Sequence, residues 1–113
     1  MHEQVMEFVE KVKARFPGSF AGKIVHEVGS RNINGTVRVF FSQCDYTGFD
    51  LGYGPCVDVV GHYAKEQRPE SADTIISCEA MEHDRNWIET LHDMIDNLKR
   101  GGLLIITAGG PGR

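Results

Sequence analysis

The feature that most constrains the fold is the stretch from Lys23 to Gly35. It starts as a short run rich in β-branched residues, Lys23 to Val28, which predicts a buried strand. Gly29 then begins a tight polar turn, and apolar residues at helical spacing predict a helix from about Ile33 to Ser42. Strand, glycine turn and helix form the opening unit of a nucleotide-binding α/β sheet. A ligand in such a sheet lies beyond the carboxyl end of the strand.

The chemistry of this turn disfavours a pyrophosphate ligand. A pyrophosphate needs a second glycine two positions after the first, and here that position is Arg31. Glu27, near the end of the strand, would repel phosphate and attract a cation. A nucleoside ligand with positive charge and no phosphate therefore fits better. S-adenosyl-L-methionine, which carries a sulfonium and an ammonium group, is such a ligand.

Five segments of the chain, in order, resemble the motifs of class I S-adenosylmethionine-dependent methyltransferases. They are Glu27-Val28-Gly29-Ser30, Tyr46 to Leu51, Val57 to Val60, Ala72 to His83, and Leu98 to Thr107. The resemblance implies an α/β fold, a three-layer Rossmann-like parallel sheet with strand order 3-2-1-4-5. It also implies methyl transfer from S-adenosyl-L-methionine to a small-molecule acceptor, with S-adenosyl-L-homocysteine as product.

The same resemblance gives the expected organisation of the chain. We expect one domain over residues 1–113, with an N-terminal helix in 1–18 and the Rossmann-like core in 23–113. Family members usually continue with two more strands and a helix. The expectation is therefore of a chain truncated after the fifth strand, which lacks the last two strands of the family.

The composition of the chain indicates which binding partners and which cellular compartment to expect. The net charge of −4 disfavours a nucleic-acid surface, which needs clustered Lys and Arg. Three cysteines without C-x-x-C spacing suggest reduced thiols and a cytoplasmic protein rather than disulfides or a zinc site. No apolar run approaches transmembrane length, so we expect no membrane partner. No ligand cluster indicates a metal.

The resemblance assigns roles to residues near the strand ends. Asp50, at the end of the second strand, would accept hydrogen bonds from the ribose hydroxyls. His62 or Tyr63 could stack on or edge the adenine, although a lone histidine is as often a surface residue, and Cys78 and Glu79 would line the methyl-transfer end. The complete set of predicted cofactor-binding residues is Glu27, Gly29, Ser30, Arg31, Asp50, Leu51, His62, Tyr63, Cys78 and Glu79.

One residue is a candidate for catalysis. His83 could act as general base toward an acceptor hydroxyl, because a histidine imidazole can accept a proton near neutral pH. The alternative is that Glu82 and His83 only order the loop into the next helix. Arg38 is interpreted as part of a solvated face.

The remaining elements follow from periodicity. A helix from about His2 to Phe16 either packs on the sheet or covers the cofactor as a lid. Its expected apolar face is Val5, Phe8, Val9, Val12 and Phe16.

The polar composition of residues 64–71 predicts a poorly ordered connection. A helix from Trp87 to Leu98 is expected to be capped by Asp84 or Asn86, and to end at Lys99-Arg100 with Gly101 as its C-cap. Leu103 to Thr107 predicts a fifth strand buried on both faces, followed by a Gly/Pro-rich loop.

Two alternative functions remain open. The chain could be a non-catalytic S-adenosylmethionine-binding module or fragment that acts through a partner chain. It could also be a small NAD-dependent oxidoreductase, against which Glu27 and Arg31 argue. Because no further strand would cover the fifth strand, we also expect a homodimer through its open edge.

Overall fold

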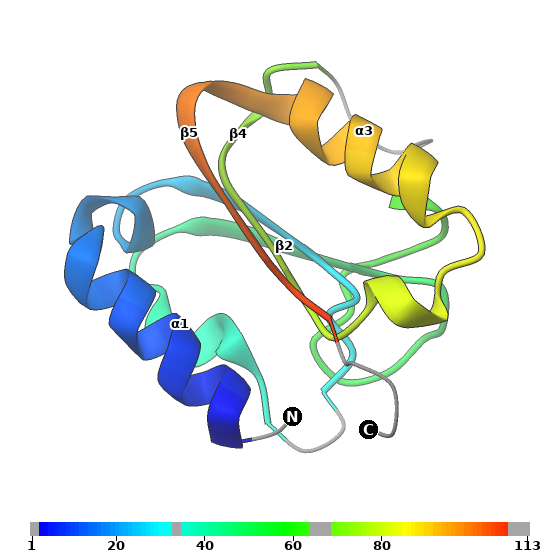
Figure 1. The fold of residues 1–113 in the computed structure, drawn as a ribbon, viewed down its shortest axis with the longest axis horizontal. Coiled ribbons are helices and arrows are strands. Elements are labelled where there is room, and N and C mark those ends of the chain that lie inside the picture. The colour runs from blue at the N-terminus through cyan, green and yellow to red at the C-terminus, as the bar shows by residue number, and fades with distance from the viewer. Residues whose placement is uncertain (1–2, 33–34, 64–68, 109–113) are drawn as a thin grey trace.

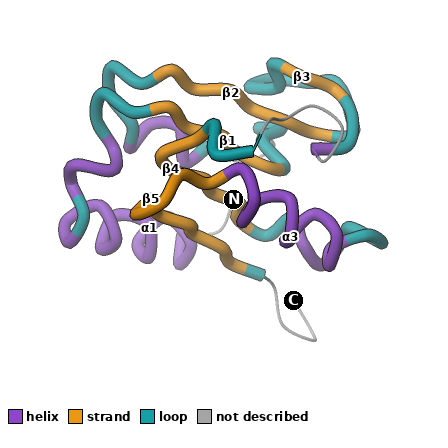
Figure 2. The backbone as a smooth tube through the Cα atoms, turned by 90° about the horizontal axis from the view of Figure 1, so that it is seen from above, coloured by secondary structure: helices purple, strands orange, loops and turns teal. Residues whose placement is uncertain are grey.

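The computed structural model describes residues 3–32, 35–63 and 69–108 of the chain. Its centre is a five-stranded, all-parallel sheet with the order β3-β2-β1-β4-β5 (Figure 2). The strands are β1 (Ile24–Val28), β2 (Asp45–Asp50), β3 (Val59–Val60), β4 (Ala72–Cys78) and β5 (Leu98–Thr107). This is a Rossmann-like α/β sheet, and it confirms the predicted fold class and strand order.

The register brings the carboxyl ends of the strands to one edge. In β1, Val25 pairs with Tyr46 of β2 on one side and with Thr74 of β4 on the other. Chain connections run from β1 outward to β2 and β3, and then cross back to β4 and β5. The gap between β1 and β4 is therefore the switch point at which open α/β sheets bind ligands.

One face of the sheet is covered by α1 (Glu3–Arg15) and by two short 3-10 helices, η1 (Pro17–Phe20) and η2 (Val37–Phe40) (Figure 1). Val9 of α1 and Phe20 of η1 are fully buried there against Val25 and Ile76 of the sheet. Helix α1 ends before Pro17, as predicted from the restriction that proline places on the preceding residue.

The opposite face is covered by α3 (Trp87–Asn97) (Figure 1). Met94 of α3 is fully buried in a second cluster with Val28, Phe49 and Ile75. A further 3-10 helix, η3 (Met81–His83), connects β4 to the start of α3. None of the helices in the described ranges is long and apolar enough to cross a membrane.

The predicted helix from Ile33 to Ser42 is wrong for the described residues. In that segment only Val37–Phe40 is helical, as a single 3-10 turn whose N-terminus is capped by the Thr36 hydroxyl. Its start at Ile33 lies outside the described residues. The run of β-branched residues around Val37 and the glycine before it favour this short turn over a regular helix.

The boundaries of the last elements also differ from the prediction. Helix α3 ends at Asn97, and β5 begins at Leu98 without an intervening loop. Lys99 and Arg100 therefore lie in β5, and Gly101 is not a C-cap. Gly101 adopts φ +80°, and the pairing of β5 with β4 shifts register nearby. A bulge in the strand accounts for the glycines that the sequence pattern assigned to a cap.

Three further predictions needed correction. Phe8 and Phe16 are each 45% exposed, so the buried face of α1 is narrower than its pattern suggested. The third strand is limited to Val59–Val60. Strand β5 is not covered on both faces along its length, because only Ile105 is buried within it. The loop predicted at the C-terminus and most of the connection predicted at residues 64–71 lie outside the described residues.

Candidate functional site

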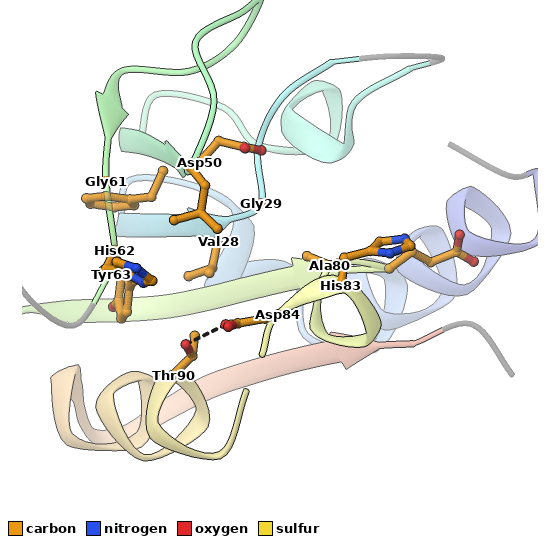
Figure 3. A pocket seen from close by; sticks show the side chains of 13 residues that line it. Val28, Gly29, Asp50, Gly61, His62, Tyr63, Ala80, His83, Asp84 and Thr90 are labelled. Atoms are coloured by element: carbon orange, nitrogen blue, oxygen red, sulfur yellow. Dashed lines mark hydrogen bonds between the residues drawn. The ribbon is translucent and has the colours of Figure 1, made fainter. Parts of the chain in front are cut away.

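A pocket lies at the switch point, where the carboxyl ends of β1 and β4 separate. Its volume is about 260 Å³. We call it the switch-point pocket, and its described lining residues are Val28, Gly29, Phe49, Asp50, Leu51, Gly61, His62, Tyr63, Glu79, Ala80, His83, Asp84 and Thr90. Figure 3 shows that Asp50, Tyr63, His83 and Thr90 surround it from four different segments.

The lining combines an apolar wall with carboxylates. Val28, Leu51, Phe49 and Tyr63 are apolar or aromatic; Leu51 is exposed, and the other three are buried. Asp50, Glu79 and Asp84 are acidic, and no Lys or Arg is among the described lining residues. A pocket of this composition favours a ligand that carries positive charge and disfavours phosphate.

Gly29 allows the loops after β1 and β4 to approach each other. Its φ is +81°, a left-handed conformation that glycine adopts without steric cost. A Cβ added at this position would overlap the Cβ of Ala80, which follows β4. Its amide donates a 2.7 Å hydrogen bond to the carbonyl of Phe49. Gly29 therefore fixes the packing of the pocket floor, a role that the sequence analysis did not assign to it.

Asp50 lines the pocket and also organises its upper loop. Its Oδ2 accepts a hydrogen bond from the amide of Arg31 at 3.1 Å, and its Oδ1 accepts one from the amide of Gly52 at 3.1 Å. Each carboxylate oxygen has a second lone pair, so Asp50 can still accept hydrogen bonds from a ligand. The position at the end of β2 is the one predicted from the sequence.

Glu79 lines the pocket in a conformation that is unusual for a non-glycine residue. Its φ is +54°, in the left-handed region, directly after β4. Its amide is held by Thr107 of β5, through the carbonyl oxygen at 2.8 Å and Oγ1 at 3.2 Å. Such a conformation costs about 1–3 kcal/mol, and backbone strain of this kind is concentrated at functional sites.

Tyr63 is positioned by a residue that the sequence analysis missed. The hydroxyl of Tyr63 lies 2.9 Å from Nδ1 of His26, in the middle of β1. The rings of His26, Phe49 and Tyr63 contact one another edge to face. Burial lowers the pKa of His26 to about 4 and raises that of Tyr63 to about 12, so both are neutral at pH 7. A histidine inside a strand gives no sequence signal of such a contact.

Asp84 connects the pocket to the start of α3. Its Oδ1 accepts a 2.7 Å hydrogen bond from the amide of Asn86, and its Oδ2 accepts one at 2.6 Å from the hydroxyl of Thr90 (Figure 3). Asn86 is the N-cap residue by position, but its side chain makes no capping hydrogen bond. Of the two caps predicted, Asp84 is the one whose side chain is engaged with the start of the helix.

His83 lies at the mouth of the pocket. Its side chain is 81% exposed, and its Nε2 lies 3.7 Å from Oε1 of Glu82. The sequence left open whether His83 acts as a base or only orders the loop. The structure places His83 among the residues that line the pocket, and its role as a base stays a prediction.

Four of the predicted site residues do not line the switch-point pocket. Glu27 faces the α1 side of the sheet, where its Oε1 accepts a 2.6 Å hydrogen bond from Tyr46. Ser30 is buried, and Arg31 supplies its backbone amide to Asp50 while its guanidinium lies close to Gly54. Cys78 is buried on the same side as Glu27, and burial raises the pKa of its thiol to about 12.

Arg38 is not simply part of a solvated face, contrary to the sequence interpretation. Its guanidinium lies 4.5 Å from the ring centroid of Tyr46, and its Nη2 forms a 2.6 Å ion pair with Asp58. The same Oδ2 of Asp58 also accepts a 2.7 Å hydrogen bond from the amide of Gly48. Arg38 thus holds η2 against β2.

Comparison with known proteins does not place the chain in a family. No model of a protein family matches the chain, and neither a curated protein nor a solved structure does. Across the described ranges, no group of three or more His, Cys, Asp and Glu residues could hold a metal ion. The parallel sheet alone cannot identify an activity, because this fold carries many unrelated functions.

Proposed function

We propose that the chain is an S-adenosyl-L-methionine-dependent methyltransferase that acts on a small-molecule acceptor. The observation that carries the proposal is the composition of the switch-point pocket: three carboxylates, an apolar wall, and no basic side chain among its described residues. A phosphorylated nucleotide would meet three like charges there. S-adenosyl-L-methionine instead presents two cationic groups and an uncharged nucleoside.

The residues present fit this cofactor. Asp50 would accept hydrogen bonds from ribose hydroxyls, and the exposed side chain of Leu51 would provide an apolar contact for a planar base. Glu79 and Asp84 would face the positively charged portion. When bound, the cofactor would supply an electrophilic methyl group on sulfur.

The chain's own contribution to the reaction would be mainly positional. Rigid packing at Gly29 and Ala80 fixes the floor of the pocket, and holding two reactants in near-attack geometry supplies much of the rate of such transfers. His83, at the mouth, would take a proton from the acceptor nucleophile. Its exposure means that a bound acceptor would have to exclude water from the imidazole.

A transfer assay tests the proposal. The chain would be incubated with S-adenosyl-L-methionine labelled in the methyl group and a panel of small alcohols, amines and phenols. Transfer of label that is lost in His83→Ala and retained in His92→Ala, a second exposed histidine outside the pocket, supports the proposal. Cofactor binding without transfer to any acceptor would instead support the non-catalytic binding module. Absence of binding would contradict both.

A further inference from the structure

Thr107 is the last residue of β5, and it pairs with Cys78, the last residue of β4. Two oxygen atoms of Thr107 share the hydrogen bond donated by the amide of Glu79, the next residue after β4. The carbonyl oxygen lies 2.8 Å from the amide nitrogen, and the side-chain Oγ1 lies 3.2 Å from it. The hydroxyl also makes a hydrogen bond with the buried thiol of Cys78. Thr107 therefore binds two successive residues at the point where the chain leaves β4 for the switch-point pocket.

Glu79 depends on contacts of this kind to keep its backbone conformation. Its φ of +54° lies in the left-handed region, which is unfavourable for a residue with a Cβ atom. A residue stays in such a conformation only where neighbouring contacts hold it there. Two such contacts are present: Ala80, the next residue, packs against Gly29, and Thr107 holds the Glu79 amide.

We propose that Thr107 is a positioning residue of the switch-point pocket, and that its hydroxyl acts by holding Glu79 in the left-handed conformation. Glu79 is among the described residues that line the pocket and Thr107 is not, so Thr107 would affect a ligand through Glu79. Any residue at this position supplies the carbonyl bond, whereas the hydroxyl bond requires threonine or serine. Without the hydroxyl, fewer molecules would hold Glu79 in place, and the affinity of the pocket would fall by the same fraction.

The ligand in this inference rests on the proposed function, in which Glu79 faces the positively charged portion of S-adenosyl-L-methionine. Adenosine shares the nucleoside of that cofactor and lacks its charged portion. A loss of the Thr107 hydroxyl should therefore weaken binding of S-adenosyl-L-methionine and leave binding of adenosine unchanged. A threonine that only stabilised the sheet would not distinguish the two ligands.

Thr74 offers a matched control for the loss of a hydroxyl. Its hydroxyl donates a 2.8 Å hydrogen bond to the carbonyl of Ser19, in η1, and the residue is fully buried. Thr74 is not among the described residues that line the pocket. Thr74→Val should therefore destabilise the fold and leave the position of Glu79 unchanged.

Amide hydrogen exchange, followed by NMR on the ¹⁵N-labelled chain, measures the hold on Glu79 without any ligand. The exchange rate of the Glu79 amide is expressed relative to that of Ile76, in β4, which corrects for a change in global stability. We expect this ratio to rise about two- to tenfold in Thr107→Val, the effect of losing one hydrogen bond. Thr107→Ser, which keeps the hydroxyl, should restore it, and Thr74→Val should not change it.

Calorimetric titration with S-adenosyl-L-methionine and with adenosine then measures the consequence for the pocket. Thr107→Val should weaken binding of S-adenosyl-L-methionine about two- to tenfold, with recovery in Thr107→Ser and no loss for adenosine. Glu79→Gly adopts the left-handed conformation without steric cost and carries no carboxylate. In that background Thr107→Val should cause no further loss of affinity for S-adenosyl-L-methionine.

The two measurements separate this inference from the proposed function. An unchanged exchange ratio for Glu79 in Thr107→Val would overturn the inference. It would also be overturned by an equal loss of affinity for both ligands, or by the same loss in Thr74→Val. If the wild-type chain binds neither ligand, the methyltransferase is contradicted, and the exchange ratios alone decide whether Thr107 positions Glu79.

Discussion

The hydroxyl of Tyr46 donates a 2.6 Å hydrogen bond to Oε1 of Glu27, on the face of the sheet that α1 covers. Glu27 is 1% exposed, and burial raises the pKa of its carboxyl to about 7. The hydrogen bond from Tyr46 and the charge of Arg38 oppose this rise in the pKa. The pKa of Glu27 is raised and that of the adjacent His26 is lowered. The contributions of these two side chains to stability should therefore depend on pH in opposite directions.

The first prediction concerns how the contribution of Glu27 to stability depends on pH. Because the folded-state pKa of Glu27, about 7, exceeds its ordinary value of 4.5, its contribution to stability is full below pH 4.5 and is lost as pH rises through 7. The unfolding free energy of the wild type minus that of Glu27→Gln should fall by roughly 2–3 kcal/mol across this window. Urea denaturation at a series of pH values measures it.

His26 should show the reverse dependence. Its folded-state pKa, about 4, lies below its ordinary value of 6.5, so its contribution is present above pH 6.5 and is lost as pH falls through 4. In Glu27→Gln, stability should therefore rise with pH between 4.5 and 6.5, and in His26→Gln it should fall. Parallel pH profiles for the two variants would show that these side chains titrate as they do in the unfolded chain.

The second prediction separates strain from packing at Gly29. Gly29 and Gly101 have nearly the same φ, +81° and +80°, but an added Cβ overlaps Ala80 only at Gly29. Left-handed backbone alone costs an alanine about 1–2 kcal/mol. Gly29→Ala should therefore destabilise the chain by at least about 1 kcal/mol more than Gly101→Ala, as measured by chemical denaturation.

A double variant provides the control for this comparison. Gly29→Ala combined with Ala80→Gly removes the overlap and leaves the strain, so it should recover part of the lost stability. Equal destabilisation by the two single alanine substitutions would show that the contact with Ala80 does not limit the turn.

The third prediction concerns Asp50. Asp50→Ala should weaken S-adenosyl-L-methionine binding by about 1–3 kcal/mol, the cost of removing a charged hydrogen-bond acceptor. The loss of the bonds to the amides of Arg31 and Gly52 should also destabilise the loop. Asp58→Ala is the matched control, because Asp58 also binds a backbone amide but does not line the pocket. Unchanged affinity in a folded Asp50→Ala chain would refute the ribose assignment.

The fourth prediction concerns self-association. In the described part of the chain β5 pairs with β4 alone, and β5 forms one edge of the sheet. An open edge of this kind can pair with a second copy, so we predict a symmetric dimer through β5. Light scattering over a dilution series should show a fall from dimer to monomer mass. A monomer at every concentration would contradict it. A charged substitution at Ile105 would not be a suitable test of pairing at the β5 edge, because Ile105 is buried and the substitution would destabilise the fold itself.

The fold was predictable because the five ordered segments that resemble a known family each contain all or part of one strand of the sheet. The run Ile24–Val28 and the run Ala72–Cys78 are buried almost throughout, as expected of central parallel strands. The helix after β1 was mispredicted because apolar spacing alone does not distinguish a regular helix from a loop that ends in one 3-10 turn. The double glycine Gly101-Gly102 is ambiguous in the same way between a cap and a bulge.

The site was predictable only in part, and the reason lies in the faces of the strands. Strand-end positions such as Asp50 and Glu79 were found because loops after parallel strands meet at one edge. Glu27 was misplaced relative to the pocket because β1 is buried on both faces, so its pattern gives no sign of which side the carboxyl takes. The contact between His26 and Tyr63 joins residues far apart in sequence, and it appears only once β1 and the segment after β3 are placed together.

The central claim is that the switch-point pocket selects a cationic nucleoside over a phosphorylated one. Calorimetric titration of the wild-type chain with S-adenosyl-L-methionine and, separately, with NAD⁺ tests it most directly. The account predicts saturable binding of S-adenosyl-L-methionine and binding of NAD⁺ that is at least tenfold weaker, because Asp50, Glu79 and Asp84 are among the residues that line the pocket. Equal or tighter binding of NAD⁺ would contradict it.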